Sequence, residues 1–303
     1  MTGKPLLEPF YRFIRNQQLI LILLAVLTGS AASLGAIVFR ESIVLIQTVT
    51  FGASLEQMSE FIADMPGWQV VLVPTAGGLL VGLMVHYLMP GRRNRGVADV
   101  MEAVALRSGS ITLREGLGAA AVSAVTIGVG ASVGREGPVV HLGATLSSFV
   151  ATRLRLSRSQ AVTLLGCGVA SAVASSFNAP IAGVFFALEV VIGHYALSAF
   201  APIVIAGVTG TIITRLYFGD FPAFIIPDQT IVSFWEFPAF ALLGVVCALS
   251  AIIFMRSVEF SSDTFARIPV PGWVKPMFGG LGVGVIALAF PQVLGVGYEA
   301  TDL

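Results

Sequence analysis

The chain has 303 residues and a formal net charge of zero; 56% of its residues are hydrophobic and 11% are charged. Its mean hydropathy is +0.89, whereas a soluble domain carries roughly 25% charged residues, so the composition excludes an ordinary soluble protein. No basic block indicates nucleic acid as a partner. Two cysteines, Cys167 and Cys247, lie within apolar sequence, which favours buried thiols over a disulfide or a metal site.

Five apolar runs are expected to be long enough to cross a bilayer, which takes about 20 residues. They cover residues 19–39, 70–89, 117–133, 199–216 and 237–254. The first run is too long for the apolar core of a cleaved signal peptide and lacks a small-residue cleavage site, so we expect it to stay in the membrane. The sequence therefore predicts an all-α, polytopic integral membrane protein.

The distribution of charge indicates an orientation. Basic residues gather in segments 4–15, 92–95 and 153–158, whereas segments 53–64 and 220–236 carry acidic residues without Lys or Arg. Because short loops rich in Lys and Arg face the cytoplasm, we expect the amino terminus to be cytoplasmic and the protein to reside in the cell (inner) membrane.

Between residues 96 and 195 the apolar pieces become short and are separated by glycine clusters, Pro138 and Pro180. This pattern predicts broken, tilted half-helices that end within the membrane. Irregular backbone at that depth is tolerated where protein surrounds it or where it lines an aqueous path. The breaks are therefore the places to look for a functional site.

Two segments form an internal repeat. "PTAGGLLVGLMVHYLMP" (74–90) and "PMFGGLGVGVIALAFP" (276–291) share the pattern P-x-x-G-G-L-x-V-G, and Pro74 and Pro276 are each expected to begin a helix. The charge distribution gives the two copies opposite directions, which is typical of inverted-repeat transporters. We expect residues 1–235 to form the first repeat with a cytoplasmic N-terminal segment. Residues 236–303 would then begin an incomplete second repeat of a longer protein.

A charged stretch, "GREGP" (134–138), lies among the broken helices. Gly137 followed by Pro138 predicts a helix start, because proline suits the first helical position, and we expect this helix to run to about residue 150. Its unpaired N–H groups and positive dipole end would attract an anion or the Glu136 carboxylate. Arg135 is expected to pair with Glu136 or with a neighbouring loop.

Together with "VVHLGA" (139–144) and "FNAPIAGVFFALE" (177–189), this stretch resembles the CLC family of chloride channels and chloride/proton antiporters. The resemblance implies an inverted repeat of tilted, incomplete helices, with Glu136 as the gate of an anion pathway. It also implies that the residues around this glutamate and the amides that begin the next helix contact the anion; these are Gly134, Arg135, Gly137, Pro138, Val139 and Val140.

A second loop in that family supplies a serine to the central chloride site, and here the aligned stretch is "NRGVADV" (94–100). Gly96 and Val97 match the family pattern and are expected to contact the anion. The serine position holds Arg95 and the proline position holds Ala98. Arg95 either belongs to the cytoplasmic basic loop or adds charge to an inner vestibule.

Proton coupling in family antiporters commonly uses a glutamate that follows the position of Glu189, and here that position holds Val190. Valine carries no proton, so the resemblance favours a passive, voltage-gated-type chloride channel. A chloride/proton antiporter is the first alternative, and a non-conducting, truncated membrane protein is the second. Glu189 is expected to cap or pair near the end of its helix.

The remaining expectations concern partners. Chloride or another small anion is the expected substrate, without a cofactor. No side-chain arrangement indicates an enzyme, and the scattered histidines give no metal site; they are His86, His141 and His194. The resemblance implies a homodimer formed through the helices around Phe186 and residues 199–216.

Overall fold

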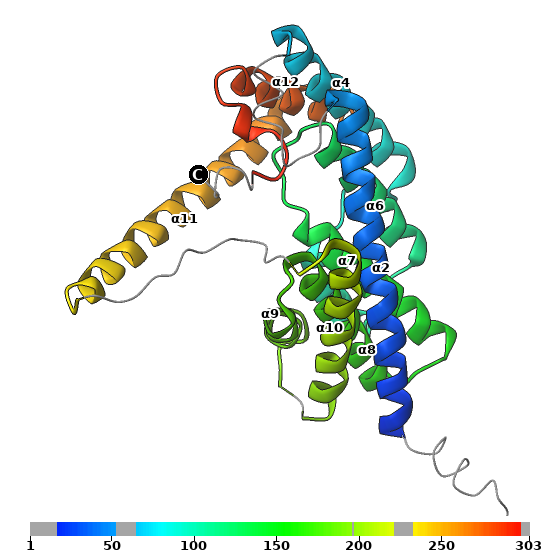
Figure 1. Ribbon diagram of the computed structural model, residues 1–303. Coiled ribbons are helices and arrows are strands. Elements are labelled where there is room, and N and C mark those ends of the chain that lie inside the picture. The colour runs from blue at the N-terminus through cyan, green and yellow to red at the C-terminus, as the bar shows by residue number, and fades with distance from the viewer. Residues whose placement is uncertain (1–16, 53–64, 196, 221–232, 298–303) are drawn as a thin grey trace, which may run out of the picture.

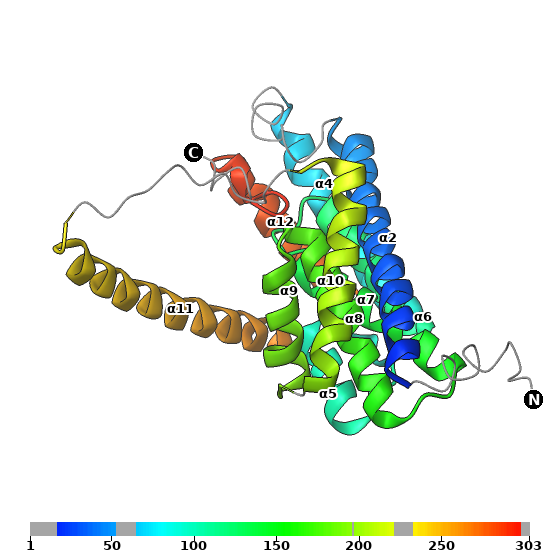
Figure 2. The ribbon, with the colours of Figure 1, turned by 60° about the horizontal axis from the view of Figure 1, so that its bottom comes forward.

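The computed structural model describes residues 17–52, 65–195, 197–220 and 233–297, and within these ranges every regular element is a helix. Helices α2, α7, α8 and α10 form the central bundle, while α4 and α12 pack together at one end of it (Figures 1 and 2). The helices are α2 (Gln17–Phe51), α4 (Gly67–Leu88), α5 (Val97–Leu106), α6 (Leu113–Gly128), α7 (Glu136–Arg153), α8 (Arg158–Phe177), α9 (Pro180–Phe186), α10 (Leu197–Phe218), α11 (Glu236–Arg267) and α12 (Lys275–Ala287), with short turns η2 (Pro90–Arg92) and η4 (Pro291–Val293) and the π-helical turn η3 (Ala187–Ile192).

Among the described residues, α2, α4, α8, α10 and α11 are long and apolar enough to cross a membrane. Four of them contain predicted runs, to within one residue at the end of α4. The run at 117–133 was wrong as a span, because α6 has 16 residues and ends at Gly128. Helix α8 was expected as short pieces and instead continues for 20 residues. Its glycines and serines lower its hydropathy below that of the other long helices and hide its length in the sequence.

Those small residues let α8 lie in the middle of the bundle. A Cβ on Gly168 of α8 would meet the carbonyl oxygen of Gly143 on α7, and a Cβ on Gly143 would meet the carbonyl oxygen of Gly168. Such close backbone approach is how helices associate in membranes. Cys167 is fully buried beside this contact, as predicted.

The two repeat copies pack against each other. Pro276 lies at the start of α12, as predicted, but Pro74 lies inside α4, so the expected helix start at Pro74 was wrong. A Cβ on Gly78 would meet the carbonyl oxygen of Pro276, and a Cβ on Gly280 would meet the carbonyl oxygen of Pro74. Equivalent residues thus exchange equivalent contacts, as a two-fold axis requires.

The order of contacts along the helices gives their direction. On α4, Gly78 contacts Pro276 and Gly82, one turn later, contacts Trp273. Trp273 comes before Pro276 in the chain, so the contacts run in opposite order along the two segments. Helices α4 and α12 are therefore antiparallel, and the repeat is inverted, as its sequence predicted. Pro74 was expected to begin a helix but lies inside α4, where it lacks the N–H group that would bond the Val70 carbonyl. That carbonyl faces Gly284 of α12, so packing against α12 covers the break in the hydrogen-bond pattern.

Helix α11 extends away from the bundle (Figures 1 and 2), and none of its residues is buried. Cys247 lies on this helix and is exposed, so the expectation of a buried thiol there was wrong. The reason is tertiary: the Lys275 ammonium of α12 donates to the Phe265 carbonyl oxygen near the end of α11, but most of the length of α11 is exposed.

The charged segments that indicated orientation lie largely outside the described residues. These are the basic N-terminal segment within 1–16 and the acidic segments 53–64 and 221–232. The cytoplasmic amino terminus accordingly stays a prediction.

Candidate functional site

The start of α7 forms the first part of the candidate site. Arg135 is the N-cap and Glu136 is the first helical residue, two positions before the expected start at Pro138. The Val139 N–H donates to the Arg135 carbonyl over 3.2 Å, so this amide, expected to face an anion, belongs to the first helical hydrogen bond. The N–H groups that a helix leaves without an intrahelical acceptor are therefore those nearer Glu136 and Gly137.

The side chain of Glu136 folds back over the loop that precedes it. A Cβ on Gly134 would collide with the Glu136 carboxylate, so the carboxylate occupies the space that this glycine leaves open. Glu136 is half-buried, whereas the side chains of Val139 and Val140 are buried in the bundle. A carboxylate at this end of α7 sits in the positive field of the helix dipole.

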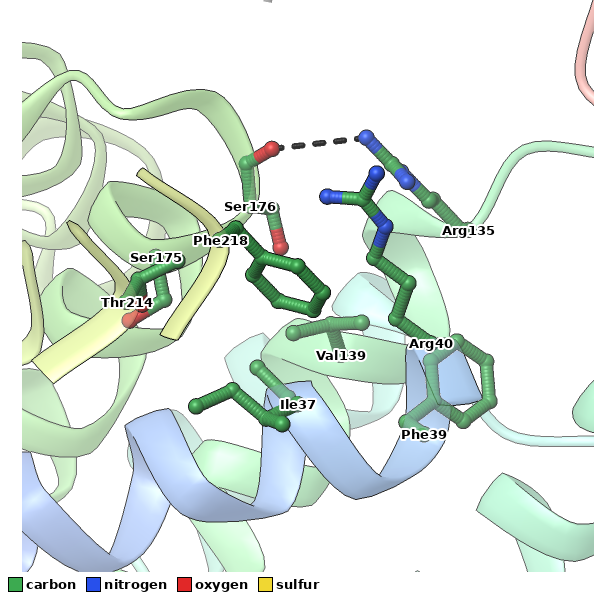
Figure 3. Close-up of a pocket in the computed structure, with 10 residues that line it drawn as sticks. Ile37, Phe39, Arg40, Arg135, Val139, Ser175, Ser176, Thr214 and Phe218 are labelled. Atoms are coloured by element: carbon green, nitrogen blue, oxygen red, sulfur yellow. Dashed lines mark hydrogen bonds between the residues drawn. The ribbon is translucent and has the colours of Figure 1, made fainter. Parts of the chain in front are cut away.

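Arg135 connects the start of α7 to the end of α8 by a hydrogen bond. Its guanidinium donates to the carbonyl oxygen of Ser176 over 3.4 Å (Figure 3). This bond to a neighbouring segment is one of the two roles expected for Arg135. It fixes the residue directly before Glu136.

The second loop, at the start of α5, is organised around Asp99. Gly96 is the N-cap of α5, and its N–H donates to the Asp99 carboxylate over 3.0 Å. Arg95 lies 2.7 Å from the same carboxylate and 3.8 Å from that of Glu115. Arg93 also contacts Asp99, at 2.9 Å. Gly96 was expected to contact an anion, and in the structure its N–H is capped by a side chain of its own helix.

Arg95 is well covered, with 12% of its side chain exposed, and the Asp99 side chain is 9% exposed. Burial raises the pKa of the Asp99 carboxyl, but hydrogen bonds from Arg95 and from the Gly96 amide, with the charge of Arg93, outweigh burial and hold that pKa below its usual range. Arg95 therefore occupies the serine position as one member of an ion-pair cluster.

Sequence reasoning missed Asp99 and Glu115. The signal for Asp99 was present, because Arg95 and Asp99 are four residues apart, as paired charges on a helix often are. Nothing in the sequence pointed to Glu115, which reaches Arg95 from the start of α6. Val97, the first residue of α5, packs against the core cluster that contains Val140, so the two candidate helix starts share one core.

The segment expected to carry proton coupling is the π-helical turn η3. Glu189 accepts a hydrogen bond from the Tyr195 hydroxyl over 3.3 Å, a pairing of the kind expected for it. Val190 is 38% exposed. Local π-helical turns are frequent at functional sites, but the side chain of Val190 has no titratable group.

Fold and site together define a polytopic helical membrane protein with an inverted repeat and charged residues at helix starts. Residues 77–303 match the family model described as the voltage-gated chloride channel. The chain therefore belongs to the CLC family.

Two curated relatives and two solved structures show how far the similarity extends. A putative ClcB-like chloride channel protein of Ralstonia nicotianae is 34% identical, with 93% of this chain and 66% of that protein covered. The chloride channel protein CLC-e of Arabidopsis thaliana is 30% identical, with 92% and 41% covered. The chain thus spans less than two thirds of the length of these relatives.

The solved structures establish the fold. A CLC-type fluoride/proton antiporter has a TM-score of 0.73 at 24% identity, with 91% of this chain and 67% of that chain covered. A slow cyanobacterial chloride/proton antiporter has a TM-score of 0.76 at 20% identity, with 92% and 66% covered.

Proposed function

We propose that the chain forms part of a pathway for chloride or another small anion, gated by Glu136 and passive in operation. The observation that carries this proposal is the place of the Glu136 carboxylate, over Gly134 at the positive end of α7. An anion that approaches this helix start competes with the carboxylate for the same N–H groups. Protonation or displacement of Glu136 would open the path.

The first test removes the negative charge of Glu136. A charge at a helix start is stabilised by about 0.3 to 2 kcal/mol, so the Glu136→Gln variant should bind chloride up to roughly 30-fold more tightly at this helix start. We expect its chloride flux in liposomes to lose most of its pH dependence. The measurement is chloride efflux from liposomes at acidic and at neutral pH, in the variant and in the wild type.

Two further variants sharpen this test. Gly134→Ala keeps the charge but places a Cβ where the Glu136 carboxylate lies, so it should displace the carboxylate from the helix start and raise chloride flux. Glu259→Gln, on exposed α11, is the matched control and should behave as the wild type. Equal pH dependence in Glu136→Gln and the wild type would contradict the gate.

A chloride/proton antiporter is the second candidate, and it is favoured by the two similar solved structures, both of which are proton-coupled antiporters. Val190 in place of a glutamate favours the passive pathway. The two differ in one measurement: a chloride gradient across liposomes should drive no proton movement through a passive pathway. Proton uptake coupled to chloride flux would establish the antiporter. The third candidate, a non-conducting membrane protein, is eliminated by any chloride flux that Glu136→Gln alters.

We further propose that residues 236–303 begin the second repeat, that the amino terminus is cytoplasmic in the cell membrane, and that the protein is a homodimer. Exposed apolar side chains on α9 and α10, among them Ile181 and Ile212, support a protein or lipid contact there. Light scattering of the purified protein measures the dimer, and labelling of a cysteine placed in the N-terminal segment measures the orientation.

A further inference from the structure

A patch of arginine side chains lies at one end of the helical bundle, where α5 is connected to α6 and α7 is connected to α8 (Figure 2). The two connections read "LRSGSITLR" (106–114) and "RLRLSRSQ" (153–160), and neither contains an acidic residue. All five of their arginines are exposed, and we call these side chains the basic patch; they are Arg107, Arg114, Arg153, Arg155 and Arg158.

Contacts between described residues bring the two connections together. A Cβ on Gly109, in the first connection, would lie 3.7 Å from the carbonyl oxygen of Ala161, near the start of α8. The Ile111 N–H donates over 2.8 Å to the hydroxyl of Ser148, near the end of α7. Arginines that are far apart in the sequence therefore share one surface.

Most of the positive charge of the basic patch is unpaired. Arg107 lies 3.4 Å from the Glu102 carboxylate, whereas the other four arginines make no ion pair with a described residue. Helix α8 also begins here, without an acidic residue in its first turn, so the positive end of its dipole lies beside Arg158. Like charges gathered in this way repel, and an anion at this surface therefore lowers the energy of the group.

The position of the basic patch along the helices indicates which anion it meets. Arg158 is the first residue of α8, which is long and apolar enough to cross a membrane, so the patch lies where this helix reaches the membrane surface. Leu106 and Leu154 are next to arginines in the chain and are 78% and 52% exposed. Such mixed apolar and basic side chains suit the boundary between acyl chains and headgroups. A guanidinium there can donate two parallel N–H bonds to a phosphate.

We propose that the basic patch binds the phosphate of an anionic phospholipid at the membrane surface, with Arg153, Arg155 and Arg158 around the headgroup. A lipid is favoured over a soluble anion because the exposed leucines offer its acyl chains an apolar surface that a free phosphate does not use. The proposal is independent of the gate at Glu136, because Glu136 begins α7 and the patch lies at the other end of that helix.

Native mass spectrometry of the purified protein measures this binding. Phosphatidylglycerol is the anionic probe, and phosphatidylcholine with the same acyl chains is its zwitterionic counterpart. We expect phosphatidylglycerol to bind the wild type more tightly. A basic residue near an anionic membrane surface contributes about fivefold in affinity, so the double variant Arg155→Gln with Arg158→Gln should lower this preference roughly 20-fold.

Matched variants separate the site from total charge. Arg256→Gln with Arg267→Gln removes two charges from exposed α11 and should keep the preference. Arg155→Lys with Arg158→Lys keeps both charges and should retain most of it. Unfolding midpoints in detergent should be unchanged in every variant, because these side chains are exposed.

Three results would overturn the proposal: equal binding of the two lipids to the wild type, an equal loss of preference in the α11 variant, or displacement of bound phosphatidylglycerol by inorganic phosphate. The first comparison needs no substitution, so it tests the proposal even if a variant fails to fold. None of these results depends on chloride flux, so failure of the gate at Glu136 would leave the lipid site standing.

Discussion

The Gly280→Ala variant should loosen the packing of α12 against α4 and lower the thermal unfolding midpoint of the purified protein. The added Cβ would meet the carbonyl oxygen and carbon of Pro74. Both are backbone atoms, which cannot turn aside as a flexible side chain can. Inserting a methyl group into such a contact costs typically about 1 to 3 kcal/mol.

The neighbouring glycine provides the matched control. A Cβ on Gly279 would meet nothing within 4 Å, so Gly279→Ala adds the same methyl group to the same helix at no steric cost. Because Gly78 makes the equivalent contact with Pro276, Gly78→Ala should destabilise by a similar amount. If Gly280→Ala and Gly279→Ala unfold at the same temperature, the close packing of the two repeat copies is wrong.

The Asp99→Asn variant should have the second large effect, because it leaves the covered Arg95 without its nearest negative charge. Asparagine keeps the shape of the side chain and one acceptor oxygen, but loses the ion pair with Arg95 at 2.7 Å. Removing one partner of a buried pair costs about 3 to 5 kcal/mol, and the more distant Glu115 offsets part of this. We expect a loss of about 3 kcal/mol in denaturant unfolding.

Glu102→Gln is the control for this prediction. Glu102 contacts Arg107 at 3.4 Å, and 45% of its side chain is exposed, so its charge should contribute less than about 1 kcal/mol. In the double variant Asp99→Asn with Arg95→Gln the unpaired charge is gone, and much of the stability should return. Equal losses in Asp99→Asn and Glu102→Gln would refute the central role of this carboxylate.

The sequence predicted those parts of the fold that depend on local pattern. The long apolar runs of α4, α10 and α11 and the start of α12 at Pro276 follow from hydropathy and from the preference of proline for the first helical turn. The same rule failed at Pro74, because its place inside α4 depends on packing against Gly280 of α12. Helix α8 was missed because its small residues serve close packing, which hydropathy does not measure.

The candidate site likewise has residues that the sequence predicts and residues that only the tertiary structure brings together. Glu136 and the helix that begins there could be found from one motif, since the glycines, the glutamate and the proline are adjacent in the chain. The contact of Glu115 with Arg95 could not, because only the fold brings the start of α6 beside Arg95. Side-chain partners from distant segments are a property of the tertiary structure.

The open position of α11 also bears on the order in which the chain is assembled. This helix is apolar, with 32 residues, and none of them is buried. In the two-stage view of membrane protein folding, a helix inserts on its own before it finds neighbours. Helix α11 meets the requirement of the first stage, since it is apolar and long enough to cross a membrane as a single helix, whereas α12 packs against α4.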